Sequence, residues 1–524
     1  MSEVEELKGK ESIKAENQQY DYIIVGAGSA GCVIARRLLD ETDAKILLLE
    51  AGELQENADV IDNPLRWIEN IGSAHDYLYP YQPSELLNNR AVFAPRGKLV
   101  GGSGSINAMI WARGHEDDYN SWADAGNKGW DFESILPLFK KIEDWFAGAS
   151  DFHGIGGPLH ISQPKELHRL DVASKAAAIS YGIPFKPDMN SRAPGSVSPT
   201  STTVKDGIRC SAFSGYLKPV LTHKNLTLST GATVTKLNFE GNQCTGLNYI
   251  KNGETFRATA AKEVILSAGA FESPRILMLS GIGKKEDLQD LGIQCLVDLP
   301  GVGQNLQDHP LLQLTFQAKE PIGKLTNNLG GTIIYWKSNE DKIKSDVMLI
   351  PIEVPVQSSE ITATHPIPEH SFGIFVGLVG VKSKGYVKMK TMAYDGPLEI
   401  QPNLVKDPED LEALAGAIEL GMALAQQPAL AEQIAQWVAP TKPLSREEVL
   451  SYIKDACGTY FHPTGTCAMG DRSESVVNEQ LGVYGVHGLR IADASVMPQI
   501  PTANTNAPTL MIAEFMAEVL LGKR

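Results

Sequence analysis

The stretch from Tyr20 to Gly52, YDYIIVGAGSAGCVIARRLLDETDAKILLLEAG, decides the fold of this chain. It begins with an apolar run at residues 22–25, which is rich in β-branched side chains and ends at a glycine, as is typical of a buried parallel strand. The motif G-x-G-x-x-G follows at residues 26–31, then a helical run at 32–39 and a second apolar run at 46–49. The stretch therefore predicts a βαβ unit with a glycine-rich turn between strand and helix.

The glycines and one acid of this unit have separate physical roles. Gly26 allows the tight turn, Gly28 lets backbone approach a pyrophosphate, and Gly31 lets the helix lie close to the strand. The N-terminus of the helix offers unpaired N–H groups to phosphates. Glu50, at the end of the second strand, can accept hydrogen bonds from ribose hydroxyls and disfavours a 2′-phosphate. The unit predicts dinucleotide binding; the alternative is a glycine-rich turn in an unrelated α/β domain.

Composition places the chain among ordinary globular proteins. It has 524 residues, of which 43% are hydrophobic and 21% are charged, and this length suggests two or three domains. Its net charge is −16, with no basic cluster, which argues against nucleic acid or an anionic membrane as a partner.

Cysteine and histidine spacing argues against a metal centre. The six cysteines form no C-x-x-C, and the eleven histidines lack metal-ligand spacing, so we expect neither a disulfide framework nor a bound metal. His115 and His153 lie in polar contexts, and we expect them to be solvated.

The N-terminal residues 1–19 are polar and have no apolar core, so they do not form a signal peptide. We expect a disordered tail there. No run of eighteen apolar residues occurs, so we expect no transmembrane span and a cytoplasmic, reducing location.

Periodicity gives a coarse order of elements along the rest of the chain. Residues 117–145 predict one amphipathic helix, and residues 152–219 have few long periodic segments. Three short runs after Asn225 alternate as an antiparallel meander does, at 226–229, 232–237 and 246–250. Residues 311–390 show β-like alternation that suits a sheet forming one wall of a substrate cavity. Further helices are predicted at residues 407–426, 444–455 and 510–521.

Five segments span nearly the whole chain after Gln19. They are the fingerprint ending in Glu50-Ala51-Gly52, the glycine-rich 97–107, GAFESPRILMLSGIG at 269–283, GVGQNLQDH at 301–309, and 462–509. Together, and in this order, they resemble the glucose–methanol–choline (GMC) oxidoreductases, a flavoprotein family. The closest likeness is to bacterial alcohol oxidases and dehydrogenases, including those acting on aryl or furanic alcohols, because of PTANTNAPTLMIAE at 501–514.

The resemblance implies an α+β chain with two domains and FAD as cofactor. The FAD-binding domain, Rossmann-like, would comprise residues 20–160, 225–310 and 457–524. The substrate-binding domain, on an antiparallel sheet, would comprise 161–224 and 311–456. By the same likeness, the residues that hold FAD are Gly26, Gly28, Ser29, Ala30, Gly31, Glu50, Ala51, Val100, Gly101, Ser105, Asn107, Ala108, Met109, Ile110, Val234, Asp493, Ala494, Asn504, Thr505 and Asn506.

His462 matches the catalytic histidine of the family, and Asn504 matches the second member of its His–His or His–Asn pair. Alcohol oxidation needs a base for the hydroxyl proton while hydride passes to the flavin, and histidine accepts a proton near neutrality. An asparagine amide can hold the substrate oxygen as charge builds. His309 is expected to be structural. Tyr460 and Phe461, beside the base, would bind flat, uncharged alcohols.

One departure from the family concerns how FAD is attached. Some members link FAD covalently through a histidine at the position of Ile106, and isoleucine cannot alkylate flavin, so attachment should be noncovalent. The expected reaction is oxidation of a primary alcohol to an aldehyde, with electrons passed to O2 or to a quinone-type acceptor. Two other activities on the same fold stay open, hydroxynitrile lyase and light-driven fatty-acid decarboxylase.

Overall fold

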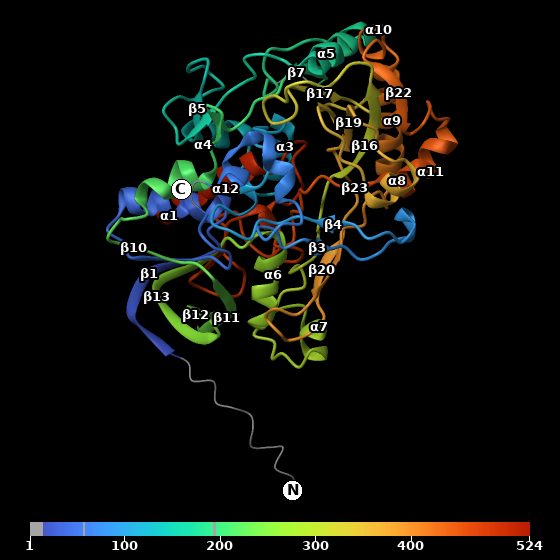
Figure 1. Ribbon diagram of the computed structural model, residues 1–524. Coiled ribbons are helices and arrows are strands. Elements are labelled where there is room, and N and C mark those ends of the chain that lie inside the picture. Colours follow the sequence, from blue (N-terminus) through green and yellow to red (C-terminus); the bar gives the residue numbers. More distant parts are fainter. Residues whose placement is uncertain (1–13, 56–57, 192–194) are drawn as a thin grey trace.

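The computed structural model describes residues 14–55, 58–191 and 195–524, which form two seven-stranded sheets (Figure 1). The first sheet is mixed, and every strand pair of the second is antiparallel. The predicted fold class is confirmed: this is an α+β chain with a Rossmann-like unit and a second, antiparallel sheet.

The first sheet is built on the predicted βαβ unit. Strands β1 and β2 are parallel neighbours, with Ile23 opposite Leu47, and helix α1 (Ser29–Glu41) connects them. The sheet order is β10-β2-β1-β13-β12-β11, with β24 beside β13. Its strands are β1 Lys14–Val25, β2 Ile46–Leu49, β10 Leu226–Ser229, β11 Ala232–Glu240, β12 Gln243–Lys251, β13 Glu254–Leu266 and β24 Leu489–Ile491.

Two expectations for this sheet need correction. The meander is formed by β11, β12 and β13, whereas β10 pairs with β2 in parallel, because alternation in a short strand does not specify its partner. Residues 14–19 belong to strand β1 and not to a tail, since backbone pairing with β13 needs no apolar side chains. The remainder of the expected tail, residues 1–13, lies outside the described residues.

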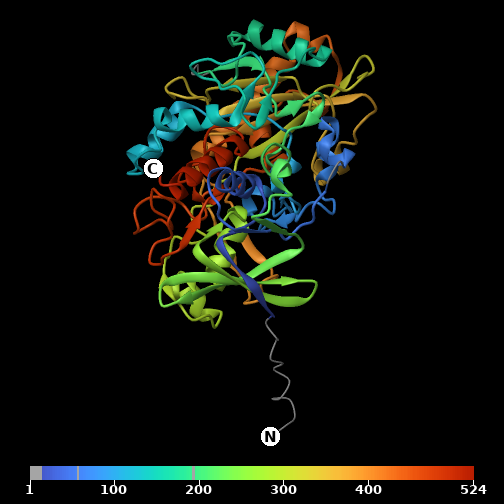
Figure 2. The same cartoon turned by 90° about the vertical axis from the view of Figure 1, so that its left-hand side faces the viewer.

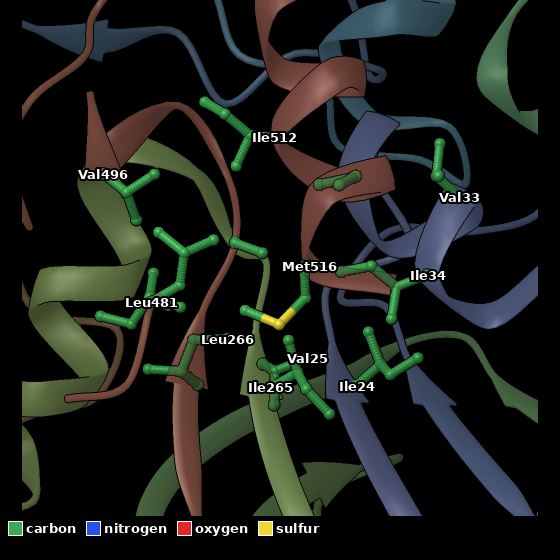
Figure 3. Packing of buried hydrophobic residues seen from close by; sticks show 14 of the residues in the cluster. Ile24, Val25, Val33, Ile34, Ile265, Leu266, Leu481, Val496, Ile512 and Met516 are labelled. Atoms are coloured by element: carbon green, nitrogen blue, oxygen red, sulfur yellow. The ribbon is translucent and has the colours of Figure 1, made fainter. Parts of the chain in front are cut away.

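The core of this half lies between the sheet and helices α1 and α12 (Asn506–Leu520), which lie side by side. Figure 3 shows Ile34 of α1 and Met516 of α12 over the strand residues Val25 and Ile265. All four side chains are buried. The last helix of the chain therefore completes the core that the first βαβ unit begins.

The second sheet has the order β22-β16-β19-β18-β17-β7, with β23 beside β16, and helix α9 (Pro408–Ala425) packs against β16, β18 and β19. Figure 2, turned from the first view, shows this sheet and its helices on the side of the molecule away from β1. Its strands are β7 Ser196–Pro199, β16 Pro310–Ala318, β17 Thr332–Trp336, β18 Val347–Ile352, β19 Ser371–Leu378, β22 Ile434–Ala439 and β23 Gly458–Thr459.

One helical prediction was wrong in detail, and one helix was not predicted. Residues 117–145 form two helices, α3 (Glu116–Asp124) and α4 (Phe132–Ile142), because Gly126 and Gly129 take left-handed φ values of 99° and 82° between them. Residues 152–219 contain a full helix, α5 (Arg169–Tyr181), which was not predicted because its sequence is only weakly amphipathic. The remaining predicted helices correspond to α9, α11 (Arg446–Ala456) and α12.

The two histidines expected to be solvated are not. His153 is only 4% exposed, with Nδ1 3.0 Å from Glu143 and Nε2 3.0 Å from Asp188, and it stacks on Trp145. His115 is half-buried and caps α3, where its ring accepts a hydrogen bond from a backbone N–H. His115 thus has a local partner at the start of its own helix, whereas the partners of His153 come from other elements, so the polarity of the neighbouring sequence did not predict its burial.

Short elements complete the described chain, and none of its helices is long and apolar enough to cross a membrane. The short α-helices are α2 Asp59–Asp62, α6 Gly269–Leu279, α7 Lys285–Asp290, α8 Ser359–Thr364 and α10 Pro428–Ala431. The 3-10 helices are η1 Pro64–Asn70, η2 Glu85–Leu87, η3 Gly102–Ser105, η5 Lys218–Val220 and η6 Ala494–Val496, and η4 Phe213–Leu217 is a π-helix. The strand pairs are β3 Tyr79–Pro80 with β4 Phe93–Ala94, β5 Glu143–Trp145 with β6 Leu159–Ile161, β8 Val204–Lys205 with β9 Ile208–Arg209, β14 Ile282–Gly283 with β15 Val297–Asp298, and β20 Tyr386–Met389 with β21 Leu398–Gln401.

Candidate functional site

A large cavity of about 1070 Å³ receives residues from both sheets. At one end it meets Gly26 and Glu50, where β1 and β2 stop, and at the other it meets Phe375 of β19. His462 and Asn504 line the same cavity. Its volume is at the upper end of the range for small-molecule sites, so a long ligand can reach from the glycine turn to the histidine.

At the βαβ end, close backbone contacts explain the glycines. A Cβ on Gly31 would lie 1.9 Å from the carbonyl oxygen of Gly26, so α1 can approach the turn only with glycine there. A Cβ on Gly102 would lie 2.8 Å from Cα of Gly28, so the two glycine-rich segments meet backbone to backbone. Gly28 is the N-cap of α1 and makes no side-chain cap hydrogen bond, which leaves the first N–H groups of the helix for a phosphate.

Glu50 lies at the end of β2 with its carboxylate buried at the cavity wall. Its Oε2 accepts a hydrogen bond from the Ala27 N–H at 2.9 Å, and its Oε1 accepts one from the Gly52 N–H at 2.8 Å. Burial raises the pKa of Glu50 to about 7, against the opposite effect of these bonds. The acid therefore positions the glycine-rich turn at Ala27 and the backbone at Gly52, and it still has lone pairs for hydroxyl donors.

The structure brings most of the predicted cofactor residues to one cavity. Gly31, Val100, Gly101 and Ser105 are exceptions: they lie behind the wall, where Ser105 Oγ donates to the Val100 carbonyl at 3.3 Å. Predicted residues that line the cavity are Gly26, Gly28, Ser29, Ala30, Glu50, Ala51, Asn107, Ala108, Met109, Ile110, Val234, Asp493, Ala494, Asn504, Thr505 and Asn506.

Contacts between distant segments hold this wall in shape. Ser29 Oγ donates to Oδ1 of Asn506 at 2.8 Å, which joins the starts of α1 and α12. Asp493 Oδ2 accepts from the Gly269 N–H at 2.8 Å and from Ser273 Oγ at 2.6 Å, which joins the start of α6 to the turn after β24. This end of the cavity is long and offers backbone N–H groups, small residues and one buried acceptor. These features fit a dinucleotide such as FAD.

The predicted catalytic pair is in direct contact. Nε2 of His462 lies 3.2 Å from Nδ2 of Asn504, and Oδ1 of Asn504 is buried without a partner among the described residues. Burial, with help from His309 and Arg96, lowers the pKa of His462 well below its ordinary value. His462 is therefore neutral near pH 7 and can accept a proton.

Sequence reasoning missed the residues behind this pair. Oδ1 of Asp308 accepts the backbone N–H of His309 at 2.8 Å and that of His462 at 2.9 Å. Its Oδ2 accepts the hydroxyls of Tyr81 and Thr459. The fourth family segment contains Asp308 and His309, but nothing in its spacing predicted contact with His462.

An apolar wall adjoins the histidine. Tyr460 lies between His462 and Phe375, with ring centroids 4.9 Å and 6.5 Å away. Phe461 has a left-handed φ of 67°, and its carbonyl accepts a hydrogen bond from Arg96. Both predicted substrate residues line the cavity. Other buried cavity residues in the same apolar cluster as Tyr460 are Trp67, Met109, Ile110, Leu311, Leu329, Ile350 and Ile352.

Comparisons with known proteins agree with this geometry. Residues 20–311 and 381–513 match two family models, each described as GMC oxidoreductase. The chain is 35% identical to the mitochondrial choline dehydrogenase of Homo sapiens, over 96% of this chain and 90% of that protein. It is also 35% identical to alcohol dehydrogenase [acceptor] of Pseudomonas putida, over 96% of both chains. Among solved structures, pyridoxine 4-oxidase from "Mesorbium loti" superposes with a TM-score of 0.91 at 33% identity, over 95% of this chain and 99% of that one.

Proposed function

This chain belongs to the GMC oxidoreductase family, and from this premise we propose that it oxidises an uncharged aryl or furanic primary alcohol to the aldehyde. At the coarser level it is an FAD-dependent oxidoreductase that acts on CH–OH donors. The finer proposal names His462 as the base and the apolar wall around Tyr460 as the substrate site.

The residues at the βαβ end would hold the cofactor. The helix start at Gly28 and the backbone of Gly102 suit a pyrophosphate, and Glu50 suits ribose hydroxyls. Bound FAD supplies the acceptor for the hydride that leaves the alcohol carbon. We propose that the FAD-binding domain comprises residues 20–160, 225–310 and 457–524, and the substrate-binding domain residues 161–224 and 311–456. The assignment of strands to the two sheets supports this division, except that β23 pairs with β16 of the second sheet.

The contact between His462 and Asn504 carries the proposal. Both side chains line the cavity, and Nε2 and Nδ2 are 3.2 Å apart, so one alcohol oxygen can contact both groups. His462 would accept the hydroxyl proton, and the amide of Asn504 would donate to the oxygen as negative charge develops on it. Burial strengthens both interactions because little water competes with them.

The wall supports an aromatic, uncharged substrate. Tyr460 and Phe375 offer ring faces and edges, and the other side chains of their cluster are aliphatic, thioether or aromatic. The cavity does have carboxylates. Glu50 and Asp493 accept hydrogen bonds from backbone N–H groups, and Asp395 is an exposed lining residue. Glu272 bonds to Tyr79 and Arg275, and Glu360 lies 3.9 Å from Arg90. Pyridoxine, the substrate in the name of one structural relative, is itself an aromatic alcohol. Choline, in the names of others, is a cation, so the substrate needs a direct test.

An anaerobic reduction experiment tests the proposal. Purified FAD-loaded protein is mixed without oxygen with benzyl alcohol, furfuryl alcohol or choline, and the flavin absorbance is followed. Fast bleaching by the first two supports it, and faster bleaching by choline contradicts the substrate class. No bleaching by any alcohol, together with cyanide release from mandelonitrile, would favour the lyase. Admitting O2 or a quinone to the reduced protein then identifies the electron acceptor.

A further inference from the structure

The side chain of His309 faces His462 from behind the cavity wall. Nδ1 of His309 lies 3.0 Å from Nδ1 of His462, and their rings are nearly perpendicular, at 88°. His309 is fully buried, and the Asp308 carboxylate holds the backbone N–H of both histidines. Asp308 therefore holds the two backbone segments together, and the ring nitrogens of the two histidines meet across this junction.

A close contact between two ring nitrogens requires one proton between them. Burial lowers the pKa of His309 to about 3, and the pKa of His462 is also well below its ordinary value. Both rings are therefore neutral near pH 7, and a neutral imidazole has one N–H and one bare nitrogen. One of the two histidines must donate at this contact and the other must accept.

Asn504 identifies the donor. Its Nδ2 can only donate, and it faces Nε2 of His462 at 3.2 Å, so Nε2 is the bare nitrogen. The proton of His462 is then on Nδ1, from where it is donated to Nδ1 of His309. We propose that His309 is a positioning residue, which accepts this bond and so holds His462 in the tautomer that has a bare Nε2 beside Asn504.

This inference rests on the proposed function of His462 as base. When the O–H bond of the alcohol breaks, its proton goes to Nε2, and both nitrogens of His462 are then protonated. The bond from Nδ1–H to His309 becomes charge-assisted, and such bonds are roughly twice as strong as neutral ones. Without the acceptor at His309, a larger fraction of the molecules has the His462 proton on Nε2, and a protonated Nε2 cannot accept the proton of the alcohol.

Two substitutions distinguish the hydrogen-bond acceptor role of His309 from a contribution of its side chain to packing alone. His309→Leu removes the acceptor and keeps a buried side chain of similar size, whereas His309→Asn places an amide oxygen near the position of Nδ1. With saturating benzyl alcohol under nitrogen, His309→Leu should reduce its flavin about 10–10³-fold more slowly, because part of His462 is in the wrong tautomer. His309→Asn should recover most of the rate. If His309→Leu does not fold, His309→Phe supplies a ring without an acceptor.

A double-mutant cycle shows whether His309 acts through His462. In a His462→Ala background, His309→Leu should change the reduction rate by less than about twofold. An equal loss in both backgrounds, or a parental rate for His309→Leu alone, overturns the positioning role. A parental rate for His462→Ala overturns the proposed function, and the positioning role with it.

A spectroscopic measurement observes the tautomer without turnover. In protein labelled with ¹⁵N-histidine, ring nitrogen shifts distinguish a bare nitrogen from an N–H, and the His462 signals are those absent from His462→Ala. The parent should show a bare Nε2 and a protonated Nδ1 at His462, and His309→Leu should shift the proton toward Nε2. A parent with Nε2 already protonated overturns the inference.

Discussion

The carboxylate oxygen Oδ1 of Asp308 accepts a hydrogen bond from the backbone N–H of His462 at 2.9 Å, although 154 residues separate the two in the chain. Asp308 ends the loop before β16, and His462 follows β23, which pairs with β16. One buried acid thus joins the segment of the proposed base to the edge of the second sheet.

Replacing Asp308 with alanine should destabilise the protein. The change leaves two backbone N–H groups and two hydroxyls without their acceptor, at a cost on the order of 3 kcal/mol or more. Denaturant unfolding of the FAD-loaded variant measures this cost. Asp308→Asn is the matched control, because its oxygen can still accept from both N–H groups, and it should lose less. Equal stability of Asp308→Ala and the parent would contradict the prediction.

Substitutions of the pair should slow flavin reduction, and His462→Ala should do so without releasing FAD. His462→Ala should lose about 10²–10⁴ in rate, the usual contribution of a positioned base. Asn504→Ala should lose less, about 10–10³-fold, since it removes one bond that strengthens as charge develops. The double variant should be less impaired than the product of the two effects, because both groups act on one oxygen. Stopped-flow reduction under nitrogen measures the step; a parental rate in His462→Ala would place the base elsewhere.

FAD binding should depend on pH through Glu50. Its pKa is about 7 in the FAD-free protein, and ribose hydroxyls prefer the carboxylate as acceptor. Affinity for FAD should therefore fall as pH drops below 7, by up to about tenfold per unit, and level off above it. Titration of the apoprotein between pH 6 and 8 measures this, and Glu50→Gln should bind FAD more weakly with no such dependence. A parent without pH dependence contradicts the role.

Glu50 should also make the stability of the FAD-free protein depend on pH, but with the opposite sign: stability should fall as pH rises, whereas FAD affinity should rise. Burial raises the folded-state pKa of Glu50 above the ordinary 4.5 to about 7, so the folded form binds its proton more tightly than the unfolded one. Its stabilising contribution is complete below pH 4.5 and is lost as pH rises toward 7. Thermal unfolding of apoprotein should show a slope of this sign that Glu50→Gln lacks.

FAD should be held without a covalent bond. Ile106 lines the cavity at the position where some family members have a histidine attached to flavin, and its side chain has no nucleophile. Acid precipitation should leave the yellow colour in the supernatant. A pellet that stays yellow after washing in denaturant would reveal a covalent link.

The sequence by itself determined those features that depend on neighbouring residues. The period of the apolar runs predicted β1, α1 and β2, and the glycine spacing predicted which residue lies close to the strand and which faces the cavity. His462 and Asn504 were found through the family motifs, and the structure brings them into contact. A local motif can specify the strand–turn–helix unit because the residues that cause it lie within the motif, whereas the contact between His462 and Asn504 joins residues 42 positions apart.

Only the tertiary structure decided the rest. His309, 153 residues from His462, touches it through Nδ1, and His153 is buried because Glu143, Asp188 and Trp145 converge on it. Contacts of this kind produce no periodic pattern in the sequence, because the two partners lie in different elements and the pairing of strands sets the distance between them. The physical reason is that strands such as β16 and β23 bring their flanking loops together by backbone hydrogen bonds, which do not depend on the side chains that then meet.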